Sequence, residues 1–296
     1  MQDNVRMIAW EDATLRPSDY SHPFAHLHES SEVLYVQEGE IEVAFSEKTY
    51  RAVGGNLIFF GPLEVHRVRL LHAPYRRLGM RISHESLLSA VREPALCSIY
   101  TARPASFSHL LRLPAAHTEA PALFQEIVNL FREKKPYYLD AMESVLGLFT
   151  VLLCRACPDA FPPISPAIRG VVYEARAYLD DHFMDSISIE ALSRMFFMSH
   201  SYFTHAFHAL TGCTPKQYLN LRRLAYARTL LGTTHQSMEE IAAQVCFADS
   251  NAFIRAFKKE LGITPGVYRR LTAGSTAPAP DKSAYVRRLG TTPAEL

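Results

Sequence analysis

Apolar and polar residues alternate in short runs over the first 95 residues of the chain. The run at 32–36 is rich in strand-forming residues, and the run at 41–45 alternates strictly, as a half-buried strand does. Three similar runs follow between turns, at 50–53, 56–60 and 66–70. Short strands separated by turns predict an all-β barrel or sandwich.

The apolar period changes to that of a helix between residues 118 and 157. A stripe with helical spacing runs from Ala122 to Phe131, and Pro136 stands where it can open a second helix. We expect these two adjacent amphipathic helices to pack on the barrel or on a second copy of the chain.

Four prolines fall within residues 158–166, which is typical of a stiff linker and a domain boundary. A new helix is predicted over 168–183. From Ala273 onwards the chain is rich in small residues and proline, and this composition predicts a disordered tail.

Residues 187–271 contain an internal repeat with a period of 50. Over positions 203–218, seven of sixteen residues recur fifty positions later. The pairs are Phe203 and Phe253, Ala206 and Ala256, Phe207 and Phe257, Gly212 and Gly262, Thr214 and Thr264, Pro215 and Pro265, and Tyr218 and Tyr268. Two copies are too few for a solenoid, which needs at least three.

Each copy carries the same helix signals. Ser188 and Ser237 precede acidic residues and predict the N-cap of a short helix. Ser199 and Asp249 predict the cap of a second, longer helix with one apolar face, which a glycine then ends. A short helix, a tight turn and a longer helix form a helix-turn-helix unit, whose second helix enters the major groove of DNA.

The second copy resembles the signature of the AraC family. The matching residues are 241–247 (IAAQVCF), 249–259 (DSNAFIRAFKK), 262–265 (GITP) and Tyr268-Arg269. The resemblance runs through about 100 residues. It implies two helix-turn-helix units on a bridging helix at 215–231, which read successive major-groove faces. Cys246 stands where the family usually has glycine, and a positive φ there would cost a cysteine about 1 kcal/mol.

Motif position assigns the DNA-contacting side chains, although each is alternatively a solvated surface group. The expected base contacts are His200, Ser201, Thr204 and His205 in the first unit, and Ser250, Asn251 and Arg255 in the second. Arg255 can donate two hydrogen bonds to guanine, and Asn251 can pair with adenine. The expected phosphate contacts are Arg223, Lys258 and Arg269.

A second resemblance lies in the N-terminal half. His26 and His28, then Glu32, then Gly39 match the first cupin motif, and residues 55–62 followed by His66 resemble the second. The resemblance implies a double-stranded β-helix barrel with an internal cavity. In metal-binding cupins the residues that match the three histidines and Glu32 hold one divalent ion, whereas many AraC-like regulators bind an organic effector there. We expect an organic effector pocket, with a metal-assisted pocket and an empty structural barrel as alternatives.

Charge and cysteine usage add little that is decisive. The chain has a net charge of +1, but Lys216 to Leu271 holds 9 Lys/Arg against 4 Asp/Glu, where a polyanion would be met. Cys154 and Cys157 form a CxxC inside an apolar helical run, without a second pair to complete a zinc site. Reduced thiols, and the absence of an apolar signal core or an 18-residue apolar run, lead us to expect a cytoplasmic protein outside the membrane.

These observations predict an α+β multidomain protein. We expect a cupin-like double-stranded β-helix barrel at 1–100, a helical connector and dimerisation region at 101–160, an all-α domain with two helix-turn-helix units at 161–272, and a disordered tail at 273–296. The predicted function is that of a ligand-responsive DNA-binding transcription regulator. We expect a homodimeric activator with double-stranded DNA, a small polar effector such as a saccharide, and RNA polymerase as partners, and with no cofactor.

The competing interpretations are a metal-sensing regulator and a metal-dependent cupin enzyme, such as a dioxygenase or isomerase, with a DNA-binding appendage. The enzyme would require bound metal and turnover. The sequence contains no Ser/His/Asp triad, Walker loop or dinucleotide fingerprint, and we therefore expect no catalytic residues. The effector, the operator and the sign of regulation stay open at this point.

Overall fold

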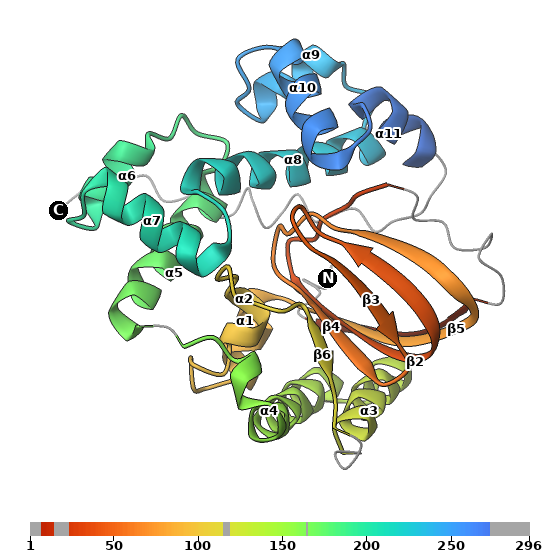
Figure 1. The fold of residues 1–296 in the computed structure, drawn as a ribbon. Coiled ribbons are helices and arrows are strands. Elements are labelled where there is room, and N and C mark those ends of the chain that lie inside the picture. Colours follow the sequence, from red (N-terminus) through yellow and green to blue (C-terminus); the bar gives the residue numbers. More distant parts are fainter. Residues whose placement is uncertain (1–6, 15–23, 115–118, 164, 273–296) are drawn as a thin grey trace.

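The computed structural model describes residues 7–14, 24–114, 119–163 and 165–272. A curled antiparallel sheet forms the N-terminal half, and a group of helices forms the C-terminal half (Figure 1). The predicted disordered tail at 273–296 lies outside the described residues.

The sheet has the strand order β1-β5-β2-β4-β6, with β3 paired to β2. Its strands are β1 Met7–Thr14, β2 Ser31–Ala44, β3 Thr49–Val53, β4 Asn56–Phe60, β5 Arg67–Ile82 and β6 Leu110–Arg112. Along one side β2 pairs with β5, and along the other it pairs first with β4 and then with β3. Register shifts between Val36 and Ile41 bend β2, so the sheet curls on itself.

Both faces of the sheet are buried near β4. Leu57 and Phe59 point towards helices, whereas Ile58 and Phe60 point into the barrel with the apolar side chains of β2 and β5. The helices on the outer face are α1 His84–Ala90, α2 Ser98–Thr101, α3 Glu119–Glu133 and α4 Tyr138–Ala156. In Figure 1, α3 and α4 lie beneath the sheet. The two helices expected at 118–157 therefore cover the barrel. Pro136 lies before α4 and does not open it, because Tyr137 takes a φ of 64°.

The C-terminal half consists of α5 Pro166–His182, α6 Ile189–Met195, α7 His200–Thr211, α8 Pro215–Thr233, α9 Met238–Gln244, α10 Ser250–Leu261 and α11 Pro265–Thr272. Figure 1 shows α8 running from the α6–α7 unit to the α9–α10 unit. The side chains of Ser188, Ser199, Ser237 and Asp249 each accept a backbone N–H at the start of a helix. The N-caps that the repeat predicted are therefore confirmed.

The turn of each unit passes through the left-handed region. Cys246 and Phe197 both have a φ of 54°. Cys246 therefore adopts the strained conformation that its position implied, and its Sγ donates to the Met184 carbonyl at 2.6 Å. The Phe197 side chain is fully exposed and has no such compensation. Both turns close without glycine at the expense of local strain.

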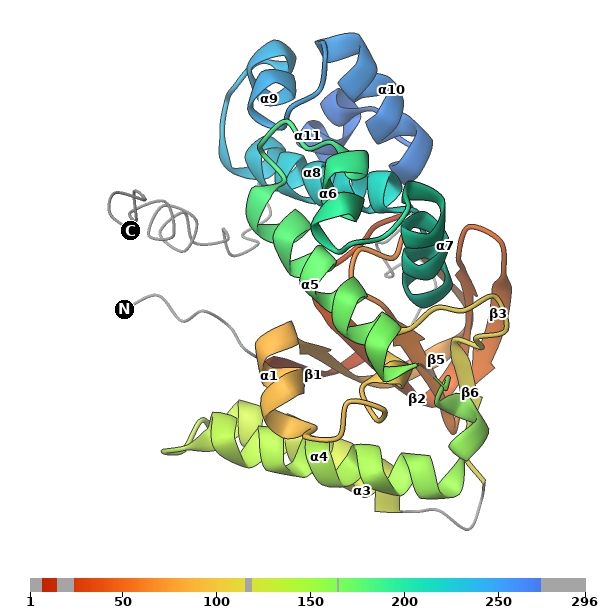
Figure 2. The same ribbon diagram turned by 90° about the vertical axis from the view of Figure 1, so that its left-hand side faces the viewer.

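These elements confirm the predicted fold class, with a cupin-like sheet domain followed by a helical domain with two helix-turn-helix units. Figure 2 shows the helical half of the chain lying against the sheet half. The two halves are in direct contact, since the core of the helical domain includes Leu27, Leu63 and Ala102 from the N-terminal half. Within the described residues, no helix combines the length and apolar character needed to cross a membrane.

Candidate functional site

Three histidines converge at the rim of the barrel, and we refer to His26, His28 and His66 together with Glu32 and Arg81 as the rim cluster. His26 and His66 form an isolated antiparallel bridge, in which each backbone N–H donates to the other's carbonyl at 2.8 and 2.9 Å. Their ring centroids are 4.2 Å apart, and the His28 ring lies 5.0 and 5.3 Å from the other two. One ring nitrogen of each histidine lies within 4.8 Å of the others.

Glu32 is buried and held on two sides. His28 Nε2 lies 2.8 Å from Glu32 Oε2, and Arg81 Nε donates to the same oxygen at 2.8 Å. Arg81 stands directly opposite Glu32 in the register of β2 and β5, and its Nη2 lies 3.1 Å from His28 Nε2. Burial alone would raise the pKa of Glu32, but His28 and Arg81 outweigh it and hold this pKa well below its usual range. The carboxylate is therefore ionised and paired with a guanidinium.

His28 and His66 are neutral near pH 7. Burial lowers the pKa of His28, and it lowers the pKa of His66 to about 4. His66 Nδ1 lies 2.9 Å from the Glu64 carbonyl oxygen, which can only accept, so Nδ1 carries the proton. His66 Nε2 then presents a lone pair. This atom is buried, and it has no hydrogen-bond partner in the described part of the chain.

The four-residue ligand set implied for a divalent ion does not fit as it stands. Glu32 already binds Arg81, and a guanidinium beside His28 would repel a cation placed there. The three imidazoles alone are still a donor set that several transition metals accept. A neutral polar or anionic group suits the rim cluster better, because Arg81 can donate to it and His66 can accept from it.

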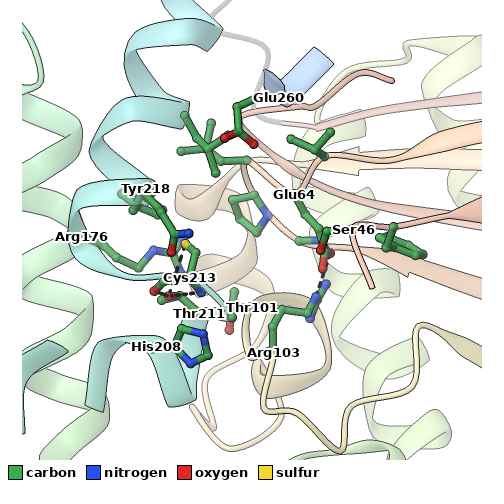
Figure 3. A pocket seen from close by; sticks show the side chains of 18 of the residues that line it. Ser46, Glu64, Thr101, Arg103, Arg176, His208, Thr211, Cys213, Tyr218 and Glu260 are labelled. Carbon is green, nitrogen blue, oxygen red and sulfur yellow. Dashed lines mark hydrogen bonds and ion pairs between the residues drawn. The ribbon is translucent and has the colours of Figure 1, made fainter. Parts of the chain in front are cut away.

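A cavity of about 300 Å³ lies between the barrel and the first helix-turn-helix unit (Figure 3). On its barrel side, Arg103 Nε donates to Glu64 Oε2 at 2.9 Å, and His109 Nε2 lies 2.7 Å from Glu64 Oε1. Burial raises the pKa of Glu64, but Arg103 and His109 overcome this effect and lower it to about 2. The Arg103 backbone N–H donates to the Leu210 carbonyl of α7 at 2.7 Å, so the residue that binds Glu64 also joins the two halves.

The second helix of each unit presents the residues that motif position assigned to the bases. His200, Ser201 and His205 are exposed on α7, while Thr204 is half-buried. Asn251 and Arg255 are exposed on α10, and Ser250 at its first turn is half-buried. The opposite faces bury Phe203 and Phe207 in α7, and Phe253 and Phe257 in α10. The two helices differ in charge, because α10 carries Arg255, Lys258 and Lys259 whereas α7 carries no lysine or arginine.

Known families and proteins match both halves of the chain. A helix-turn-helix domain model matches residues 192–271, and a cupin domain model matches residues 12–73. The uncharacterised HTH-type transcriptional regulator YisR of Bacillus subtilis is 24% identical over 252 residues, which are 82% of this chain and 86% of YisR. The HTH-type transcriptional activator RhaS of Escherichia fergusonii is 39% identical over 94 residues, covering 32% of this chain and 34% of RhaS.

The C-terminal domain is an AraC-type helix-turn-helix domain, and these relatives are named as HTH-type transcription regulators. The fold of the whole chain agrees with this assignment. ToxT of Vibrio cholerae, solved with an unsaturated fatty acid bound, has a TM-score of 0.62 and 11% identity, over 94% of this chain and 99% of ToxT. The molecule is thus an AraC-type DNA-binding transcription regulator with an N-terminal cupin effector domain.

The residues assigned to phosphates lie in different surroundings in this AraC-type protein. Lys258 is exposed on α10. Arg223 donates to the carbonyls of Phe183, Cys246 and Asp185 at 2.8, 3.1 and 2.9 Å. Arg269 donates to the Gln236 carbonyl at 2.5 Å. The phosphate contacts stay predictions, and for Arg223 the structure adds a second role, which is to tie the α5–α6 loop and the turn of the second unit to α8.

The sequence motifs did not identify several residues that contribute to these sites. Arg81 lies 49 positions beyond Glu32 and becomes its partner only through strand pairing. Arg103 sits in the loop after α2, where no local pattern marks it. Tyr202 is 52% exposed on α7 beside the assigned base contacts. Helical spacing on the exposed face of 200–205 would have included Tyr202.

Proposed function

We propose that the protein is a ligand-responsive activator of transcription, whose effector is a small polar metabolite bound at the rim cluster. The supporting observation is the buried Nε2 lone pair of His66, beside an ionised Glu32–Arg81 pair. Buried polar atoms are costly to leave without partners. A hydroxyl group on the effector can hydrogen-bond to both residues, because it donates to the His66 imidazole nitrogen and accepts from the Arg81 guanidinium. A saccharide or related polyol is therefore the proposed effector class.

The effector proposal is tested by thermal shift. Wild-type protein is screened with neutral sugars, sugar acids and polyols, since a ligand that binds the folded state raises the melting temperature with concentration. We expect one class to stabilise the wild type and to lose this effect in His28→Ala. A matched control is Glu42→Gln, which removes an exposed ion pair with Arg69 on the same sheet. Equal stabilisation of wild type and His28→Ala would remove the effector from the rim cluster.

The second candidate function is metal sensing, which the convergence of the three imidazoles favours. It requires stoichiometric zinc, nickel, iron or manganese in purified protein, lost in His28→Ala. The third alternative, a cupin enzyme, also requires turnover. We propose that the protein is a regulator and not an enzyme. Both YisR, which matches most of the chain, and RhaS, which matches its C-terminal part, are named as transcriptional regulators.

The fatty acid in the ToxT structure gives a further ligand class to include in the screen. In this chain the cavity between the halves has ionised and polar groups in its lining, namely Glu64, Arg103, Arg176, His208 and Glu260. Such a lining disfavours a long acyl chain and suits a short polar or charged molecule. A stabilising effect of long-chain fatty acids that survives His28→Ala would locate the effector in this cavity.

We also propose a homodimer that forms through α3 and α4. The α4 side chain of Leu148 is 51% exposed, and Tyr137 just before α4 is 82% exposed. Large exposed apolar side chains on α4 and directly before it suit an interface between copies. DNA-dependent activation by the dimer would then be measured by transcription in vitro with RNA polymerase on a promoter fragment that the protein binds.

A further inference from the structure

Residues 24–29, between β1 and β2, have two faces with different neighbours. The rings of His26 and His28 face the rim cluster. Leu27, between them, is 1% exposed and belongs to the apolar core of the C-terminal domain. Successive side chains of an extended chain point to opposite sides, so the same peptide bonds hold both the cluster and the domain contact.

The bridging helix α8 binds this segment through two arginines. Arg228 Nη1 donates to the Leu27 carbonyl oxygen at 2.6 Å. Arg222 Nη1 donates to Glu29 Oε1 at 2.8 Å, and the Arg222 side chain is only 6% exposed. The Phe24 ring also packs edge-to-face on Tyr268 of α11, with centroids 6.3 Å apart. The segment therefore contacts the helical domain at three successive points.

Each arginine also binds a helix that packs against one helix-turn-helix unit. Arg222 Nε lies 3.5 Å from Asp180 Oδ1 of α5, which packs against α7 of the first unit. Arg228 Nε donates to the Tyr268 hydroxyl of α11 at 3.3 Å, and α11 packs on α10 of the second unit. A displacement of residues 24–29 would thus reach the supports of both units at once.

The second histidine-bearing segment is connected in the same way. The backbone N–H of Leu63 donates to the His28 carbonyl at 2.6 Å, and the Leu63 side chain is buried in the core of the helical domain. Three residues further on, His66 is joined to His26 by the backbone bridge. The two segments that supply the cluster are therefore held to one another and to the helical domain.

We propose that residues 24–29 are the coupling segment of this regulator, which passes the occupancy of the rim cluster directly to α8 through the Leu27 carbonyl and Glu29. This inference rests on the proposed effector site. A ligand can shift the two halves only if it binds one of their arrangements better than the other. Here the ligand-facing and domain-facing groups are adjacent residues, so no extended pathway through the barrel is needed.

The test is a double-mutant cycle on the full-length protein. The variants are His28→Asn, Glu29→Gln and the double variant, and Glu42→Gln serves as a control that removes a carboxylate facing solvent. The affinity for a duplex that wild-type protein selects from a random-sequence pool is measured by fluorescence anisotropy. We expect Glu29→Gln to tighten binding about fivefold or more, because docking on the barrel restrains α8. We expect His28→Asn to act in the same direction and to add nothing in the Glu29→Gln background.

Each outcome bears on a specific claim. Multiplicative effects in the double variant, or a Glu29→Gln affinity equal to that of Glu42→Gln, would overturn the coupling segment. If His28→Asn fails to fold, His26→Asn replaces it in the same cycle. A distance measured by spin labels on α4 and α10 should broaden in Glu29→Gln, and an unchanged distance would also count against coupling. Failure of the wild type to select any duplex would instead contradict the regulator function itself.

Discussion

Arg81 and Glu32 stand directly opposite one another on β5 and β2, and Arg81 Nε donates to Glu32 Oε2 at 2.8 Å. This ion pair disfavours the metal binding that the cupin motif would otherwise allow. The carboxylate expected to bind a metal ion is neutralised within the protein, while burial keeps the imidazoles of His28 and His66 uncharged. The rim cluster thus already contains a fixed cation, and a second one would have to displace it.

Removing this internal cation should open the cluster to metal. We expect wild-type protein to show no thermal stabilisation by Zn²⁺ or Ni²⁺ at stoichiometric concentration. Arg81→Met should lower stability by about 1–3 kcal/mol, because the buried Glu32 carboxylate loses its guanidinium partner and keeps only His28. The same variant should be stabilised by added metal, since the three imidazoles and a carboxylate without its guanidinium partner then form a ligand set.

Arg69→Met is the matched control, because Arg69 is on the same strand and pairs with Glu42 in an exposed position. It should behave as wild type towards metal. Stoichiometric metal in wild-type protein by elemental analysis would show that Arg81 does not keep the site closed to cations.

The contrast between His66 and Arg81 shows how far the sequence could predict this site. The histidines and Glu32 fall in two short windows with fixed spacing, so local pattern was enough to group them. Arg81 depends on which residues of two long, bulged strands face one another, and the register shifts after Val36 cannot be read from alternation alone.

The helices and their ends could be predicted from the sequence, whereas the tertiary contacts of their side chains could not. The repeat predicted both helix-turn-helix units and their capping residues, because caps and apolar faces are local signals. Arg223 was assigned to phosphate from motif position, yet its guanidinium reaches carbonyls at Phe183, Asp185 and Cys246. Its partners lie about 40 residues before it and 23 after it, beyond what a local pattern contains.

The second unit should dominate electrostatic binding to DNA, because α10 carries three basic residues and α7 has no lysine or arginine. Arg255→Ala should cost about 1–3 kcal/mol at one operator position and relax specificity there. Lys258→Ala should weaken all duplexes alike and lower the salt slope by about 1. Affinities for the selected duplex and for single-base variants, measured over a salt series, distinguish the two roles. Equal losses on selected and random DNA for Arg255→Ala would place Arg255 at the phosphates.

Acid stability should depend on the Glu64–Arg103 pair. The pKa of Glu64 is lowered from 4.5 to about 2, so its contribution is fully present above pH 4.5. It is lost as pH falls from 4.5 towards 2, because the unfolded chain takes up the proton first. The shift corresponds to a contribution on the order of 3 kcal/mol. Urea unfolding of Glu64→Gln should show this loss at pH 7 and a flatter profile below pH 4.5. A profile parallel to that of the wild type would refute the assignment.

Substitutions of two similarly exposed leucines distinguish an effect on the proposed dimer from an effect on folding. Leu148 on α4 and Leu88 on α1 are 51% and 47% exposed. Leu148→Lys should give a monomer by light scattering at tens of micromolar, because a charge would be buried between copies. Leu88→Lys should leave the dimer intact. A monomeric wild type would end the proposal, and dissociation by both variants would place the interface elsewhere.

Replacing Phe197 in the turn of the first unit should stabilise the protein. Phe197 combines a φ of 54° with a fully exposed ring, so the residue bears backbone strain without compensating burial. Phe197→Asn should raise the free energy of unfolding by about 1 kcal/mol, because asparagine tolerates the left-handed region. Cys246→Asn is the comparison, since Cys246 has the same φ but donates from Sγ to the Met184 carbonyl at 2.6 Å. That variant should gain little, because the relief of strain is offset by the lost contact. Urea midpoints of both variants measure the difference. A lower midpoint for Phe197→Asn would mean that the ring is covered in solution by a second molecule.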